Sequence, residues 1–128
     1  MRLLLDTHAF LWWLAGSRRL SRSARQAIED EANDVLVSAA SAWEITTKHR
    51  LGKLPEADHV ALDVAATIAS QSFEELPISV DDAGRAGRLP GPHRDPFDRV
   101  LVAQALARDL VVVSTDPVFD GYAVSRLW

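Results

Sequence analysis

Four acidic residues occupy positions where an α/β chain gathers side chains that can do chemistry. Each follows a short apolar run or lies near the start of a predicted helix, and the four are Asp6, Glu44, Asp98 and Asp116. Because parallel strands open on one shared crevice at their carboxyl ends, we expect these carboxylates to converge. Oxygen ligands of this kind bind hard divalent cations, and such cations support phosphate chemistry.

Asp6 and Glu44 also have local structural explanations. Asp6 can cap the helix that begins beside it. Glu44 lies three residues after Ser41, which is the spacing of a capping box, and four residues before Lys48, which allows an ion pair on one helix face. Neither acid is diagnostic when it is considered alone.

The acids in the second half of the chain have equally good local explanations. Asp95 fits the N-cap of a helix whose first residue is Pro96, with Asp98 in the first turn facing the helix dipole. Asp116 and Pro117 together are a common turn opener. The joint arrangement favours a cation site, because four carboxylates packed in one crevice repel each other unless a cation offsets their charge.

The elements that must position these acids alternate between strands and helices. Strands buried on both faces are predicted at 2–6, 35–38 and 110–114, with shorter strands at 73–76 and 122–124. Helices are predicted at 7–14, 21–31, 39–51, 60–69, 81–89 and 96–108, with a loop at 91–94. This alternation predicts one α/β domain over residues 1–128, with a parallel central sheet flanked by helices on both faces.

Amino-acid composition limits which kinds of protein this chain can be. The 128 residues are 48% hydrophobic, which suits a single domain with a real core. Cysteine is absent, so disulfides and thiolate zinc sites are excluded. No apolar run approaches membrane-spanning length and the first residues show no signal-peptide pattern, so we expect a soluble, cytoplasmic protein without a membrane partner.

The net charge of −4 argues at first against a nucleic-acid partner. Basic residues nevertheless cluster in two segments, which contain Arg18, Arg19, Arg22 and Arg25, and then Lys48, His49, Arg50 and Lys53. A basic rim around an acidic, cation-binding centre is consistent with a nuclease. Clusters as small as these are more often solvated helix faces.

The order of the motifs resembles that of VapC-type PIN-domain toxins. The matching segments are LLLDTH at 3–8, SAWEI at 41–45, HRDPFDRVLVAQA at 93–105 and VVVSTD at 111–116. The resemblance covers essentially the whole chain, and all four acidic positions are kept. The resemblance therefore predicts a PIN-like nuclease domain.

The resemblance also implies an activity and partners. It implies a Mg²⁺- or Mn²⁺-dependent endoribonuclease, the toxin of a type II toxin–antitoxin pair, which is usually a homodimer and is held inactive by a small VapB-like antitoxin. Metal-site and catalytic roles carry over to Asp6, Glu44, Asp98 and Asp116, with Thr115 and Asp95 in support. The target RNA and the number of metal ions are not implied.

Three other functions compete with this one. A phosphatase with an aspartyl-phosphate requires a second acid two residues after Asp6, but His8 stands there. A metal-independent ribonuclease could use histidines, of which His8 and His93 lie near the predicted site while His49 and His59 fit surface positions. A catalytically silent RNA- or protein-binding domain with structural acids is the third possibility.

Aromatic residues suggest a contact surface for a partner. Phe10, Trp12 and Trp13 give one short helix more bulky apolar area than it easily buries, and Trp43 stands on another helix. Most of this area is expected in the core. An exposed remainder would suit an antitoxin or dimer contact, because tryptophan is enriched at binding hot spots.

Overall fold

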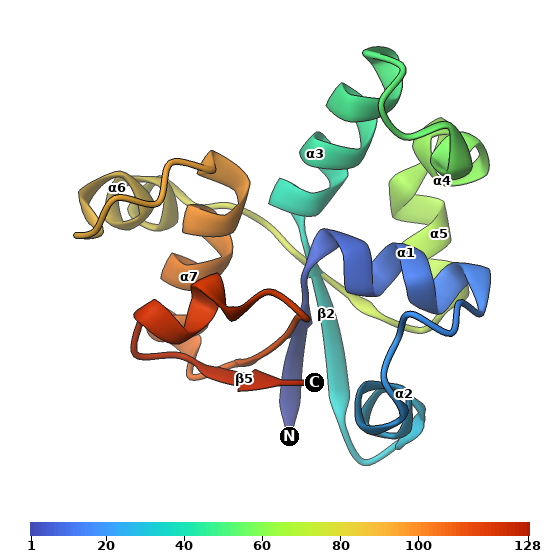
Figure 1. Ribbon diagram of the computed structural model, residues 1–128, viewed down its shortest axis with the longest axis horizontal. Coiled ribbons are helices and arrows are strands. Elements are labelled where there is room, and N and C mark those ends of the chain that lie inside the picture. Colours follow the sequence, from blue (N-terminus) through green and yellow to red (C-terminus); the bar gives the residue numbers. More distant parts are fainter.

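Five parallel strands form the centre of the molecule in the computed structural model, which describes residues 1–128 (Figure 1). The strands are β1 (Arg2–Leu5), β2 (Asp34–Ser38), β3 (Glu74–Leu76), β4 (Val111–Val113) and β5 (Ser125–Leu127). They lie in the order β3-β2-β1-β4-β5, so β1 is central. Its Leu4 pairs with Leu36 on one side and Val112 on the other. The predicted parallel sheet is confirmed.

Helices cover both faces of this sheet (Figure 1). They are α1 (Thr7–Ala15), α2 (Arg22–Glu29), α3 (Ala39–Arg50), α4 (Asp58–Leu62), α5 (Val64–Ser70), α6 (Val80–Arg88) and α7 (Pro96–Arg108), with 3₁₀ turns η1 (Pro55–Ala57) and η2 (Pro117–Gly121). None is both long enough and apolar enough to cross a bilayer.

The apolar strand runs serve two separate cores. Leu3 and Leu5 point into a core shared with α1, α2 and α5, whereas Leu4 between them points into a core shared with α7. Successive side chains of a strand face opposite sides of the sheet, so a strand covered on both faces must be apolar at every position. That requirement explains the uninterrupted leucine and valine runs.

Two predicted elements differ in the structure. The single helix predicted at 60–69 is wrong, because the chain breaks into α4 and α5 at Asp63. Asp63 has extended backbone (φ −158°), and its carboxylate accepts a hydrogen bond from Ala66 N that caps α5. The last strand, predicted at 122–124, begins only at Ser125, because η2 and the Tyr122 N–H bonded to Phe119 O keep the preceding residues in a turn.

A buried carboxylate, Asp82, joins α6 to α7. Both terminal nitrogens of Arg108 donate to Asp82 at 3.0 Å, and Ser79 N and Gln104 Nε2 donate to it as well. Burial alone would raise the pKa of Asp82, but the hydrogen bonds from Arg108, Ser79 and Gln104 lower it to about 2. The ion pair therefore stabilises the packing of α7, the helix that carries Asp98.

The variant Arg108→Met should lower the free energy of unfolding by roughly 2 kcal/mol or more at pH 7, because Asp82 stays buried without its main donor. A lowered carboxylate pKa adds stability above pH 4 that is lost as the pH falls through about 2, so the variant should differ less from wild type at low pH. Urea unfolding at pH 7 and pH 2.5 measures the loss of stability and its dependence on pH. The control is Arg85→Met, which breaks an exposed pair with Asp81. Equal losses from both variants would contradict this role for Asp82.

Candidate active site at the carboxyl ends of the strands

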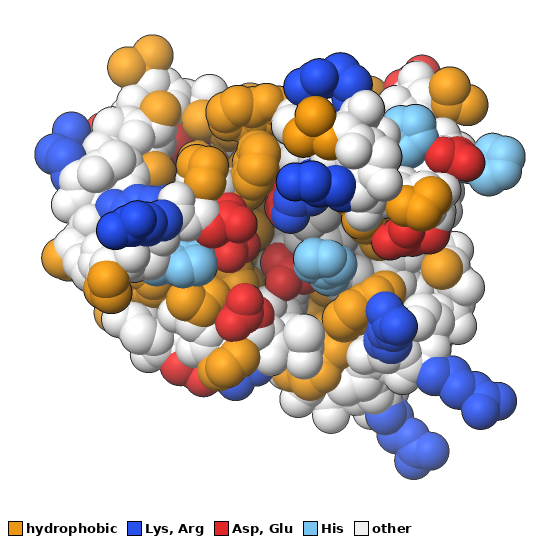
Figure 2. Space-filling view, turned by 45° about the horizontal axis from the view of Figure 1, so that its top comes forward, with side chains coloured by type: hydrophobic (Ala, Val, Ile, Leu, Met, Phe, Trp, Pro, Cys, Tyr) orange, Lys and Arg blue, Asp and Glu red, His pale blue; other side chains and the backbone are white.

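The carboxyl ends of the strands open on a cleft of about 450 Å³. It is lined by Asp6, Thr7, His8, Trp12, Glu44, Lys48, Asp95, Asp98, Thr115, Asp116 and Pro117. All four predicted acids therefore share one cleft, and both predicted supporting residues line it too. Figure 2 shows acidic side chains around a hollow in the middle of this face, with histidine side chains on both sides of them.

Asp6 forms the floor of the cleft at the end of central strand β1. Its carboxylate accepts a hydrogen bond from Ala9 N at 2.8 Å and caps α1, so the predicted capping role is confirmed. The side chain is also nearly buried in the cleft (8% exposed). Burial raises the pKa of Asp6, and the charge of Glu44 raises it further, although hydrogen bonds from Ser114 and Ala9 oppose the change. Capping the helix and lining the cleft are compatible here.

Glu44 reaches the cleft from α3 and is held by two neighbours. Thr7 Oγ1 donates to Glu44 Oε1 at 2.6 Å, and Lys48 pairs with Oε2. The predicted pair with Lys48 is confirmed, but the capping-box explanation is wrong because Ser38 caps α3. Burial alone would lower the pKa of Lys48, yet the hydrogen bond and charge of Glu44 and the charges of Asp95 and Asp98 raise it. The field in the cleft is therefore strongly negative.

Asp95 and Asp98 enter the cleft from the start of α7. Asp95 accepts from Phe97 N at 2.9 Å and from Asp98 N at 3.0 Å, which confirms it as the N-cap before Pro96. Burial raises the pKa of Asp98 to about 6, with repulsion from Asp95 and Glu44 adding to it and a hydrogen bond from His93 opposing it. Asp98 is thus a carboxylate whose charge the surrounding acids disfavour.

Asp116 lies at the exposed rim of the cleft after β4. It accepts from Val118 N at 2.9 Å and opens η2, so the predicted turn role is confirmed. The buried hydroxyl beside it is that of Ser114, which accepts from Asp116 N at 3.0 Å and also hydrogen-bonds Asp6. Thr115 lines the cleft beside Asp116.

Sequence reasoning missed two residues that hold the acids in place: Ser114 and Thr7. A small hydroxyl residue directly after a strand-end acid is a usable signal for Thr7, whereas Ser114 is separated from Asp116 by Thr115. Lys48, which the sequence places both in an ion pair with Glu44 and in a basic cluster, is the one Lys or Arg side chain that lines the cleft.

The residues of the cleft fit a hard divalent cation by their chemistry. The acidic donors offer only oxygen, and the raised pKa of Asp6 and of Asp98 indicates that nearby positive charge would favour both carboxylates. No group of three or more carboxylate or imidazole side chains is arranged to hold an ion together. Mg²⁺ does not require such a group, because it keeps several waters and is commonly bound through one or two carboxylates.

An apolar groove of about 680 Å³ continues from the cleft along α1. Its lining includes His8, Trp12, Leu11, Leu14, Arg19 and Val60, and the first two of these also line the cleft. Trp12 contacts His8 and Trp128, with ring centroids 5.7 Å apart in each pair. Residues four apart on a helix share a face, so His8 and Trp12 join the cleft to the groove.

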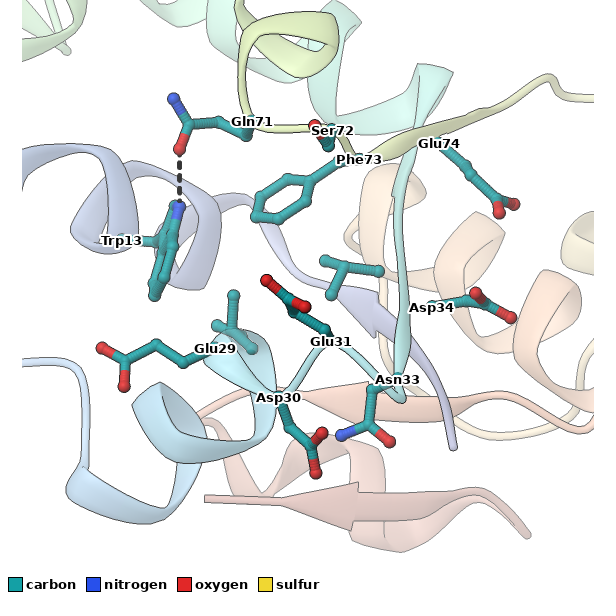
Figure 3. A pocket seen from close by; sticks show the side chains of 12 residues that line it. Trp13, Glu29, Asp30, Glu31, Asn33, Asp34, Gln71, Ser72, Phe73 and Glu74 are labelled. Atoms are coloured by element: carbon teal, nitrogen blue, oxygen red, sulfur yellow. Dashed lines mark hydrogen bonds between the residues drawn. The ribbon is translucent and has the colours of Figure 1, made fainter.

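Trp13 points away from this groove into a second pocket on the other side of α1 (Figure 3). Its Nε1 donates to Gln71 Oε1 at 3.0 Å, and its ring packs against Phe73. Several acids line this pocket, but Figure 3 shows their carboxylates pointing in different directions. Trp13 therefore belongs to the packing between α1 and α5.

The other predicted surface residues lie outside the cleft. His49 Nε2 is 2.6 Å from Asp58 Oδ1 in an exposed pair, and His59 lines the apolar groove. Arg18, Arg19 and Arg22 are exposed, whereas Arg25 donates to the carbonyl of Ser17. These basic residues form no rim around the acids.

Comparison with known proteins agrees with the geometry. The model of the PIN domain family matches residues 3–124. The ribonuclease VapC22 of Mycobacterium tuberculosis is 33% identical over 118 residues, which are 88% of this chain and 85% of the relative. VapBC2 from Rickettsia felis, bound to a DNA fragment, superimposes with a TM-score of 0.72 at 17% identity over 99% of this chain and 98% of that one. A toxin–antitoxin complex from Klebsiella pneumoniae gives a TM-score of 0.68 at 20% identity, over 98% and 96%.

Asp98→Asn should make the protein more stable than wild type at pH 8, by up to about 3 kcal/mol when EDTA is present, because Asn carries no charge to be repelled. In the wild-type protein, the raised pKa of the Asp98 carboxyl contributes stability that is complete below pH 4, where this group is protonated. That stability is lost as the pH rises through about 6. The advantage of the variant should therefore shrink towards pH 4.5. Urea unfolding at both pH values tests this.

The matched control is Asp34→Asn, an exposed acid outside the cleft, which should change stability by less than about 0.5 kcal/mol at either pH. An Asp98→Asn variant that is less stable than wild type at pH 8 would show that the fold needs the charge at the start of α7. The capping dipole would then be the better account of Asp98.

Proposed function

The chain belongs to the PIN domain family, with VapC-type ribonucleases among its relatives, and from this premise we propose that it is a divalent-metal-dependent endoribonuclease. It would act as the toxin of a type II toxin–antitoxin pair and hydrolyse RNA phosphodiester bonds. The observation that carries the proposal is the convergence of Asp6, Glu44, Asp98 and Asp116 in one cleft. Capping accounts for Asp6 and Asp116 but not for Glu44 and Asp98, because Ser38 caps α3 and Asp95 caps α7.

Asp6, Glu44, Asp98 and Asp116, which line the same cleft, are the residues that would hold Mg²⁺ or Mn²⁺. When bound, the ion would supply an activated water and offset charge on the phosphate. Thr7 and Lys48 orient Glu44, and Ser114 orients Asp6. Lys48 also brings positive charge to a cleft that a polyanion must enter.

A metal-independent ribonuclease mechanism would use His8 and His93 as general base and general acid. The positions of these two histidines disfavour it. His8 lines the cleft, but His93 does not. His93 instead lies behind Asp98, with its Nε2 3.0 Å from the carboxylate. A general acid and a general base must both reach the substrate, so only one of these histidines is placed for that task.

An antitoxin segment is the partner that the apolar groove beside the cleft fits best. We infer that an amphipathic segment covers Trp12 and Leu11 and directs an Arg or Lys side chain to the carboxylates. The toxin–antitoxin complexes among the structural neighbours support an antitoxin as the partner. A homodimer remains a proposal, for which the exposed Trp43 (57%) packed on Phe97 offers apolar area.

Cleavage of RNA by the full chain should stop in EDTA and return with Mg²⁺ or Mn²⁺, because the proposed site has no side-chain nucleophile. Asp6→Asn should reduce the cleavage rate by roughly 100-fold or more in saturating Mg²⁺. Asp34→Asn should retain the wild-type rate. Rates come from gel analysis of an end-labelled RNA. Undiminished cleavage in EDTA would instead support the histidine mechanism, and activity that survives loss of all four acids would place catalysis elsewhere.

Trp12→Ala should weaken binding of the cognate antitoxin by about 10-fold or more while the chain stays folded, because Trp12 lines the open groove. Trp13→Ala is the matched control on the same helix. It should mainly lower stability, by roughly 3 kcal/mol, because Trp13 packs against Phe73 and bonds Gln71. Calorimetric binding and thermal melts separate these effects. Wild-type affinity in a folded Trp12→Ala variant would remove this groove from the interface.

A further inference from the structure

The loop between α6 and α7 places a histidine against one carboxylate of the cleft. His93 Nε2 lies 3.0 Å from Asp98 Oδ2. It is the one side-chain donor to this carboxylate, and Oδ1 accepts no hydrogen bond. The imidazole is largely covered (23% exposed), as is the carboxylate (21%). The contact therefore fixes one oxygen of Asp98 and leaves the other without a hydrogen-bond partner, in a residue that lines the cleft.

The loop itself is held by Arg99, the residue after Asp98. Its Nη1 donates to the carbonyl of His93 at 2.9 Å and its Nε to the carbonyl of Ala86 at 3.0 Å. Its Nη2 donates to the carbonyls of Leu89 and Gly87. One guanidinium thus ties the last turn of α6 to the far end of the loop.

These bonds suit arginine in particular. Carbonyls at the end of a helix have no partner within the helix, and a guanidinium presents several donors in a fixed plane. A lysine ammonium is a point charge and cannot reach carbonyls so far apart in one geometry. Arg94 in the same loop is exposed and makes no hydrogen bond, so charge alone does not explain the arrangement.

We propose that Arg99 is a positioning residue for the cleft, which holds the loop so that His93 fixes the orientation of the Asp98 carboxylate. The inference rests on the proposed function, because Asp98 is taken as a carboxylate that binds the ion. Partners behind a binding carboxylate set its orientation, and their loss typically weakens metal binding by about 10–100-fold. Arg99 acts through His93 and does not touch the ion or RNA.

The test measures the affinity of the full chain for Mn²⁺ alone, by electron paramagnetic resonance without RNA. His93→Ala should weaken binding by roughly 10–100-fold, and His93→Gln, which keeps a side-chain N–H donor, should restore part of it. Arg99→Lys should also weaken binding by about 10-fold, while Arg94→Lys, in the same loop, should not. Because Arg99 acts through His93, the Mn²⁺ affinity of the double variant His93→Ala with Arg99→Lys should match that of His93→Ala alone within about 2-fold.

A purely structural role for Arg99 predicts a different outcome. Unfolding would then occur at lower urea in Arg99→Lys, with unchanged Mn²⁺ affinity in the folded protein, and this result would overturn the proposal. Additive losses in the double variant would overturn it as well. If Arg99→Lys does not fold, the two His93 variants test the step to Asp98, and unchanged affinity in both would reject it.

A measurement without metal separates this proposal from the proposed function. In ¹H–¹⁵N spectra the hydrogen-bonded Nε2–H of His93 should give a resonance that is lost in Arg99→Lys and kept in Arg94→Lys. Persistence of that resonance in Arg99→Lys would overturn the positioning role. A wild-type chain that binds no Mn²⁺ would overturn the proposed function, and the spectra would still show whether Arg99 positions His93.

Discussion

Repulsion among carboxylates in a partly buried cleft is the constraint on which the rest of the structure depends. Burial and neighbouring acidic charge raise the pKa of Asp6 and of Asp98, so both carboxylates are costly to ionise in the cleft. Each carboxylate is therefore held by a donor from the surrounding structure. Thr7 and Lys48 hold Glu44, and backbone and hydroxyl groups hold Asp6. The fold keeps charges together that would otherwise separate.

Three of the cleft acids also cap the start of a helix or 3₁₀ turn. Asp6, Asp95 and Asp116 each accept a backbone N–H at the start of a helix or 3₁₀ turn, so the same carboxylate that lines the cleft also satisfies the local backbone. The structural and the chemical explanations of these acids are thus compatible. Because parallel strands deliver the starts of the following helices to one edge, caps in different parts of the sequence meet in space.

Helix α1 shows how one short element serves three purposes. Asp6 caps it, His8 and Trp12 line the cleft and groove, and Trp13 packs into the core region on the opposite side. Adjacent residues on a helix are about 100° apart, so neighbouring tryptophans must face different surroundings. The two indoles therefore differ in environment although they are neighbours in sequence.

The sequence by itself determined the parallel sheet and the acids of the cleft, since buried strands, caps and turn openers depend on contacts within a few residues. It also determined Asp95 as the cap of α7 and Asp116 as the opener of η2. The break at Asp63 and the start of β5 at Ser125 also follow from local bonds, Ala66 N to Asp63 and Tyr122 N to Phe119 O, which compete with equally good helix and strand patterns in the sequence. Tertiary structure alone placed Arg99 on the carbonyls of the His93 loop, because such contacts join groups whose meeting depends on how α6 packs against α7.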